Sequence, residues 1–152
     1  MANAIEILTD VCDHFAQCIY DVEPIGSGMK RWRRYDRSVT DQRLADTAER
    51  VRLFDVYPDA TAFDGIVEQQ GITEVDHNVI VNIDICYGSE DLHTMAAHRD
   101  YEAIRRKIFS TASGHVTGYQ FPTFAGFEWI DRDDSKFRYI RIPVAVRITV
   151  TE

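Results

Sequence analysis

The sequence predicts an α+β fold in which two helices flank an antiparallel or mixed sheet of about four to five strands. Residues 77–87 and 136–151 alternate apolar and other side chains with the period of two that is typical of strands. Residues 3–20 and 92–112 instead repeat apolar residues every three or four positions, as amphipathic helices do. At 152 residues, the chain is expected to form a single domain over residues 1–152.

The first helix is expected from Asn3 to Tyr20, with one apolar side that packs on the sheet. Beyond it, residues 25–50 match no regular element, and we interpret them as an extended basic arm. A long irregular segment in a small domain is more often functional than not. The apolar side of the helix is predicted to consist of Ile5, Leu8, Cys12, Phe15 and Ile19.

Several shorter segments complete the predicted fold. Val51 to Tyr57 is predicted to form a strand that ends at Pro58 and Asp59. Phe63 to Val67 is a candidate for a further small strand. The second helix is expected to bury Ala97, Tyr101, Ile104 and Ile108. Residues 126–130 are predicted to form a hairpin with the last strand across an acidic turn at 131–135.

The last strand, residues 136–151, is unusually long. At ~3.3 Å per residue it would span roughly 45–50 Å, against a domain diameter of roughly 30 Å. Pro143 cannot donate a ladder hydrogen bond, so it favours an edge, a bulge or a break. We therefore expect part of this strand to present an open edge, which another copy of the chain would cover.

Composition excludes several classes of protein. Hydrophobic residues make up 45% of the chain and charged residues 28%, so a globular protein is expected rather than a disordered one. No early apolar segment follows a basic start and no membrane-spanning run occurs, so neither a signal peptide nor a membrane partner is predicted. Three cysteines without a C-x-x-C spacing indicate neither a disulfide framework nor a zinc finger.

The charge is unevenly distributed. The formal net charge of −8 opposes general affinity for nucleic acid, yet residues 30–50 carry seven Lys/Arg against four acids, a local charge of +3. The rest of the chain is therefore at −11. This basic stretch is the most informative feature of the sequence.

No set of residues has the spacing of a catalytic or metal site, and we predict no enzyme activity, no metal and no cofactor. The acidic turn at 131–135 lacks the glycine and glutamate of an EF-hand loop, and a solvated turn is favoured. His93 and His98 are five residues apart, which separates them on a helix. Cys86 is more typical of a small buried hydrophobe than of a nucleophile, and Ser27 lacks a nucleophile elbow.

The basic arm and the last strand supply the candidate interface residues. Arginines interleaved with Trp and Tyr are the usual anchors of protein interfaces, and this reading is favoured. The same residues would also suit phosphate binding and base stacking, and a disordered basic loop is the third alternative. The predicted interface comprises Lys30, Arg31, Trp32, Arg33, Arg34, Tyr35, Arg141, Pro143 and Arg147.

The order of elements resembles a known family. A first helix, a long excursion, the strand Val79 to Ile85, an Arg-rich helix, the segment Phe127 to Asp131 and the strand Tyr139 to Val150 that ends the chain together resemble the tail terminators of long-tailed phages. These are the lambda-type minor tail proteins that join tail to head. The arm at residues 26–50 is longer here than in the lambda-type pattern, and no residue role is carried over.

The resemblance implies a virion structural protein of the head–tail joint, assembled from subunits made in the host cytoplasm. Such a protein forms a homohexameric ring, caps the tail tube, ends its polymerisation and offers a surface to the head connector. Its partners would be other copies of itself, the tube protein and a neck protein, with DNA passing through the ring without specific binding. The alternatives are a neighbouring neck or connector protein, or a nucleic-acid-binding module that uses the basic arm.

Overall fold

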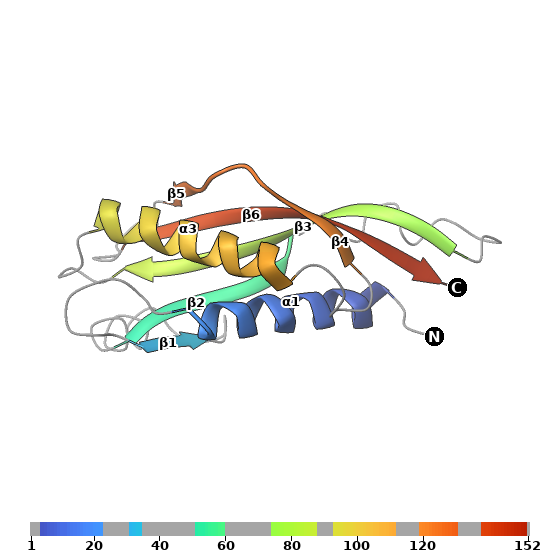
Figure 1. Cartoon of the computed structure of the whole chain (residues 1–152), viewed down its shortest axis with the longest axis horizontal. Helices are drawn as coiled ribbons and strands as arrows, with labels where there is room; N and C mark the ends of the chain where they lie inside the picture. The colour runs from blue at the N-terminus through green and yellow to red at the C-terminus, as the bar shows by residue number, and fades with distance from the viewer. Residues whose placement is uncertain are drawn as a thin grey trace.

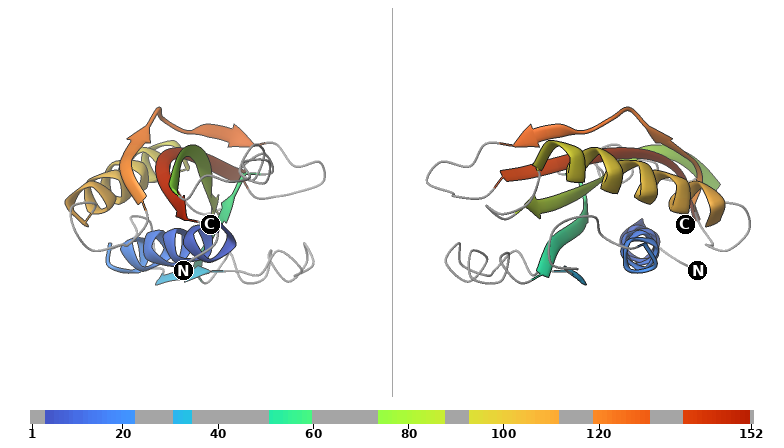
Figure 2. Two further views of the ribbon diagram at one scale, coloured as in Figure 1. Left: turned by 90° about the vertical axis from the view of Figure 1, so that its right-hand side faces the viewer. Right: turned by 60° about the vertical axis from the view of Figure 1, so that its left-hand side comes forward.

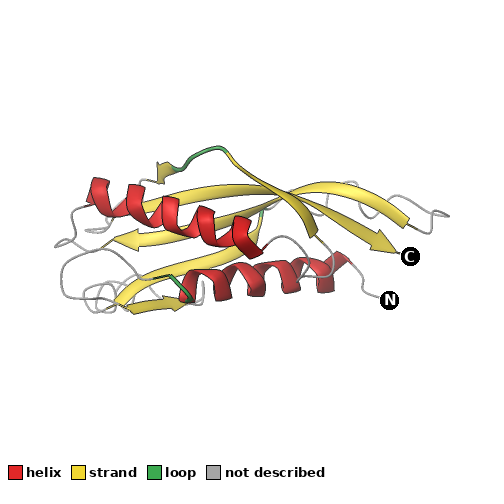
Figure 3. Ribbon diagram, in the orientation of Figure 1, coloured by secondary structure: helices red, strands yellow, loops and turns green. Residues whose placement is uncertain are grey.

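The computed structural model describes residues 4–22, 31–34, 51–59, 74–87, 93–111, 119–130 and 138–151. Over these residues, two helices pack against a six-stranded mixed sheet (Figures 1 and 3). The predicted α+β class is therefore confirmed. The elements in order are α1 (Ala4–Tyr20), β1 (Arg31–Arg34), β2 (Val51–Pro58), β3 (Glu74–Tyr87), α3 (His93–Thr111), β4 (Tyr119–Phe124), β5 (Glu128–Ile130) and β6 (Arg138–Thr151).

Both predicted helices and the four main predicted strands are present, with shifted ends. Two strands, β1 and β4, were not predicted, and they raise the number from the expected four or five to six. The short strand predicted at Phe63–Val67 and the acidic turn at 131–135 lie outside the described residues.

The strand order is β1-β2-β3-β6-β4, and β5 pairs with β6 beyond this path. β1 runs parallel to β2, while every other pairing among the described strands is antiparallel, so the sheet is mixed. The predicted hairpin of β5 with β6 is confirmed, with Glu128 opposite Arg141. The long connection between β1 and β2 is what a parallel pair requires.

The open edge predicted for the last strand is absent over most of its length. β6 pairs with β3 at each of its fourteen residues, from Arg138 opposite Tyr87 to Thr151 opposite Glu74. Its other side pairs with β5 from Tyr139 to Arg141 and with β4 between Val144 and Ile148, and no described strand pairs with residues 149–151 on that side. β6 is long because β3 is equally long, and the partner that completes it comes from the same chain (Figure 1).

Pro143 lies at a break in the ladder, one of the three settings predicted for it. It stands opposite Asn82 of β3. On the other side of β6, pairing with β4 ends at Val144 and pairing with β5 resumes at Arg141. Because neither β4 nor β5 pairs with β6 at Pro143, the missing N–H of this proline removes no hydrogen bond on that side of the strand.

One end of β3 has no described partner strand on one of its two sides. The last pair between β2 and β3 is Pro58 opposite Val81, and the Asp59 N–H donates to the Ile80 carbonyl at 2.9 Å. Among the described strands, none pairs with residues 74–79 on this side. The β3–β6 ribbon thus continues past the end of β2 (Figure 1).

The core lies between the helices and one face of the sheet, which we call the helix face. The alternation predicted for β3 and β6 is confirmed where side chains are described, because the odd residues from Val79 to Tyr87 and the even residues from Ile140 to Ile148 belong to the buried core. Burying one such side chain contributes roughly 1.5–3 kcal/mol. The most deeply buried members include Val11, Phe15, Ile19, Val81, Ile83, Ile85, Ile104, Ile108, Ile140, Ile142 and Val144.

The buried side of α1 differs from the prediction at its start. Ile5 was expected to face the sheet, but 66% of its surface is exposed, whereas Ile7 and Leu8 are buried. The buried side therefore begins at Ile7, because the apolar pairs Ile7-Leu8 and Val11-Cys12 are centred away from Ile5. The other members of the predicted side are buried as expected.

The two helices pack on different but overlapping parts of the sheet. α1 packs chiefly on β1 and β2 and also contacts β6, whereas α3 contacts β4 and β6, and the two helices contact each other. Figure 2 shows this helix layer from two further sides. The opposite face of the sheet, which we call the second face, carries no described helix.

Candidate interaction surfaces

The arginine-rich segment splits between the two faces of the sheet. Arg31–Arg34 form the edge strand β1, so the irregular conformation predicted for these four residues is wrong. Strand alternation directs Trp32 and Arg34 to the helix face, and Arg33 to the second face, where it is exposed. Of Arg31 only the backbone is described. Lys30 and Tyr35 lie outside the described residues.

Trp32 belongs to the core. Its side chain is 7% exposed, and its indole Nε1–H donates to the Val22 carbonyl at 2.9 Å. Its ring meets that of Phe54 edge to face, with 5.8 Å between centroids. A buried indole with its polar group satisfied is a packing residue in this subunit.

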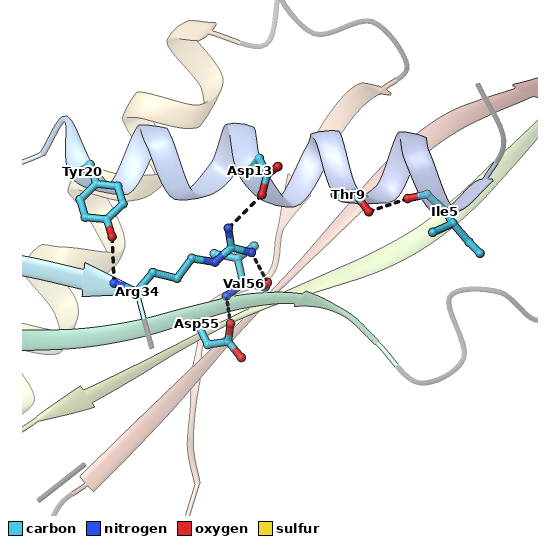
Figure 4. Close-up of polar contacts among 7 residues, drawn as sticks. All are labelled: Ile5, Thr9, Asp13, Tyr20, Arg34, Asp55 and Val56. Atoms are coloured by element: carbon cyan, nitrogen blue, oxygen red, sulfur yellow. Dashed lines mark hydrogen bonds and ion pairs between the residues drawn. The ribbon is translucent and has the colours of Figure 1, made fainter. Parts of the chain in front are cut away.

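Arg34 is held by contacts within the chain (Figure 4). Its guanidinium donates to Asp13 Oδ1 of α1 at 2.9 Å and to the Val56 carbonyl of β2 at 3.0 Å. Its backbone N–H donates to the Tyr20 hydroxyl at 3.0 Å. The structure thus ties α1 to the outer strand through Arg34, so neither Trp32 nor Arg34 projects as an arm.

Beneath Trp32 lies a buried ion pair that the sequence did not reveal. Arg52 Nη1 and Asp100 Oδ2 are 2.8 Å apart, and both side chains are fully buried. The Tyr87 hydroxyl donates to the same carboxylate oxygen at 2.8 Å. The guanidinium carbon lies 6.0 Å from the Trp32 ring and 4.8 Å from the Tyr87 ring, so β1, β2, β3 and α3 meet around one charge.

The predicted residues of the last strand share the second face. Arg141, Pro143 and Arg147 alternate with the buried residues of β6, as expected. Arg141 Nε donates to Asp84 Oδ1 at 3.0 Å, and the Tyr57 hydroxyl donates to Asp84 Oδ2 at 2.6 Å. The hydrogen bond to Asp84 raises the pKa of the Arg141 guanidinium above its ordinary value, so Arg141 remains charged at any physiological pH.

Arg147 is the exposed member of this set. It stands opposite Asn78 and next to an open hollow of about 440 Å³ that Asn78, Thr123, Ala145 and Val146 also line. Ile80, on the same face, is 42% exposed. On its second face, the part of the β3–β6 ribbon that extends past the end of β2 therefore presents a mixed polar and apolar surface. Asp84 and Cys86, on the same face but nearer the other end of β3, are buried.

A ladder of aromatic rings joins α3 to the β4–β5 segment, and sequence analysis did not identify it. Tyr101 lies between Phe124 and Phe127, with centroid distances of 6.1 and 5.5 Å. Its hydroxyl accepts from the N–H of Gly126, whose φ of +89° suits glycine. Arg138 covers the Trp129 ring at 3.8 Å. The four-residue spacing of Tyr101, Arg105 and Phe109, which puts them on one side of α3, is the sequence pattern from which this ladder could have been predicted.

The cysteines do not form a reactive centre. Cys86 is buried, as predicted, and so are Cys12 and Cys18. Burial raises the pKa of the Cys12 thiol to about 12 and raises that of Cys18 as well. Cys18 Sγ lies 3.6 Å from His14 Nε2 and 3.4 Å from Thr111 Oγ1. Both thiols stay protonated at neutral pH, and a protonated thiol is a poor nucleophile.

The described residues contain no group of three or more His, Cys, Asp or Glu side chains that would suit a metal ion. Neither α1 nor α3 has the length and apolar character needed to span a membrane. No protein-family model matches the chain, and no curated protein matches it at a significant level.

Proposed function

We propose that the chain is a virion structural protein of the tail-terminator type. In this proposal, copies of the chain form a ring, with six as the expected number, that caps the tail tube of a long-tailed phage. The ring ends polymerisation of the tube and offers a surface to the head connector. Subunits are made in the host cytoplasm and act in the virion at the head–tail joint.

The order of elements supports this proposal. The first helix is followed by a long excursion, and after the second helix come β4 and then the β5–β6 hairpin, whose last strand ends the described part of the chain. This is the order on which the resemblance to tail terminators rests. Architecture alone leaves function open, because one fold serves many roles.

The observation that carries the assembly argument is the open edge of β3. Residues 74–79 pair with β6 on one side and with no described strand on the other. An edge of this kind is a template for strand addition by a neighbouring chain or by a tube subunit. The expected assembly edge thus lies on β3, whereas β6 is paired within the subunit along the whole of its β3 side and over most of its other side.

The experiment is to measure the mass and the shape of the purified chain, alone and with tail tubes. Mass photometry is expected to give a particle of six chain masses, and negative-stain images are expected to show rings at one end of each tube. Adding the chain during tube polymerisation is expected to shorten the tubes. A particle that stays monomeric at high concentration and with tubes present would refute the proposal.

The alternative, a nucleic-acid-binding module that uses the basic arm, is disfavoured because two residues of that arm are engaged within the subunit. Its stacking residue Trp32 is 7% exposed, and Arg34 is engaged with Asp13 and Val56. That alternative predicts binding that weakens steeply with salt and is lost after Arg31→Ala and Arg33→Ala. A neighbouring neck or connector protein remains the closest alternative, and images of tube-bound against connector-bound particles separate the two.

A further inference from the structure

The outward side of α3 carries one continuous exposed stripe. Met95, Arg99, Glu102, Arg106 and Phe109 follow each other at steps of three or four residues, so they line one side of the helix. Met95 is 54% exposed and Phe109 is 44% exposed. Glu102 is held by Arg105 at 2.9 Å and lies 3.6 Å from Arg106. With four Lys/Arg and two acids in the helix, one of them the buried Asp100, this stripe is basic.

The outward side of α1 carries a stripe of the opposite charge. Glu6, Asp10, Asp13, Gln17 and Tyr20 follow each other at steps of three or four residues, and Tyr20 is 47% exposed. The helix contains three acids and no Lys or Arg, and one of the acids, Asp13, also pairs with Arg34 of its own subunit. Acids therefore dominate the stripe on α1, whereas Arg99 and Arg106 outnumber Glu102 in the stripe on α3.

The two stripes also match in length. At ~1.5 Å per residue, Glu6 to Tyr20 and Met95 to Phe109 each extend over roughly 21 Å. Exposed apolar side chains flanked by charges are typical of docking surfaces rather than of a solvated helix. We call them the α1 stripe and the α3 stripe.

We propose that the α1 stripe of one copy docks on the α3 stripe of the next copy. The partner is a second copy of this chain, because it supplies a helical stripe of equal length and opposite charge, with an exposed aromatic residue, Tyr20 or Phe109, at one end of each stripe. Opposite potentials steer such surfaces together and select the correct partner. This inference rests on the proposed ring and names the contact that would hold it.

The contact joins two different surfaces, so it is heterologous. A heterologous contact repeats from copy to copy and closes into a ring when its rotation permits. α1 packs chiefly on β1 and β2 but also reaches β6, and α3 packs on β4 and β6, so the two stripes lie on different helices of one helix layer. An isologous pair of identical stripes would instead bring like charges together.

The test uses the full chain and three charge variants. Arg99→Glu with Arg106→Glu reverses the α3 stripe, and Asp10→Lys with Gln17→Lys reverses the α1 stripe. Each is expected to raise the apparent dissociation constant of self-association about tenfold, measured by sedimentation velocity in low salt. The chain with all four changes has a formal charge of −9, close to the native −8, and is expected to return to within about twofold of the native value.

The matched control reverses two arginines of the second face, Arg33→Glu with Arg147→Glu, which changes the net charge by the same amount as the α3 variant. It is expected to leave self-association within about twofold of the native value. Met95→Ser, which alters no charge, is expected to weaken association about threefold and covers the case in which a charge variant fails to fold. Circular dichroism verifies the fold of each variant.

Native rings that persist in both reversed variants would overturn this contact and leave the proposed function standing. Rings that dissolve only in the second-face control would do the same, as would a short DNA duplex that binds the native chain but not the α3 variant while assembly is unchanged. A native chain that forms no ring under any condition would overturn the proposed function itself.

Discussion

Two arginine-rich segments of this protein, β1 and α3, differ in how their side chains are placed. In β1, which is four residues long, Trp32 is buried in the core and Arg34 is paired with Asp13. In α3, Arg99 and Arg106 stand on the exposed side of the helix, although the sequence drew attention to β1 and treated α3 as an ordinary covering helix. The density of charge along a sequence does not by itself show which charges reach the surface.

The difference follows from the geometry of the two elements. A strand sends alternate side chains to opposite faces, so a strand placed under a helix must bury every second residue. A helix that lies on a sheet buries one side and leaves the other to solvent. Four predictions test this contrast between an inward β1 and an outward α3, in order of expected effect.

The largest effect is expected at the ion pair under Trp32. Asp100→Asn keeps the shape of the side chain but removes the charge that faces Arg52 in a fully buried site. The free energy of unfolding is expected to fall by about 4 kcal/mol, because a buried charge then loses its counter-charge. Urea unfolding measures the change. Glu102→Gln on the exposed side of the same helix is the control, with an expected change within about 0.5 kcal/mol.

The second effect concerns Trp32 itself. Trp32→Ala removes a buried ring and its hydrogen bond to Val22, and is expected to lower the unfolding free energy by about 3 kcal/mol. Trp32→Phe, which keeps a ring in the core, is expected to cost less. Should Trp32→Ala leave stability unchanged and abolish self-association, Trp32 would be an interface anchor and β1 would not be an inward strand.

The third prediction uses the buried thiols as a reporter of the core under α1. The folded pKa of Cys12, about 12, lies above the ordinary value of 9.0. Between these values the unfolded chain loses a proton that the folded chain retains, so stability is complete below pH 9 and falls above it. The contribution is about 1.4 kcal/mol per pH unit. Urea unfolding at pH 8, 9 and 10 is expected to show a shallower decline for Cys12→Ala than for the native chain, and equal slopes would contradict the prediction.

The smallest effect separates the two arginine surfaces directly. Arg34→Met removes an exposed ion pair with Asp13 and a hydrogen bond to Val56, at an expected cost of about 1 kcal/mol. Arg106→Met is expected to change stability by less than about 0.5 kcal/mol. Thermal unfolding of the two variants in parallel measures the difference. A larger loss for Arg106 than for Arg34 would reverse the comparison.

Much of the fold was predictable because its signals are local. The alternation of β3 and β6 and the apolar spacing of α3 each act within one element, and all three are confirmed. β1 was missed because four residues in a row of arginines carry too little pattern. β4 was missed because Pro122 stands within it, at a bulge between Gln120 and Thr123.

The candidate sites were less predictable, since they depend on which element lies beside which. Arg141, Pro143 and Arg147 do share one face, as alternation requires. That Arg52 of β2 meets Asp100 of α3, 48 residues away, depends on how distant elements pack together and cannot be predicted from either segment alone. The aromatic ladder depends likewise on Gly126 donating to Tyr101 across 25 residues.

The sequence alone determined the class of the fold, the long final strand and the side of each main strand that enters the core, because side-chain direction follows from backbone periodicity. Only the tertiary structure decided which strand keeps an unpaired edge. Hydrogen bonding between strands joins residues far apart in the chain, so β3 could pair with β6 along its whole length and remain open itself over residues 74–79 among the described strands.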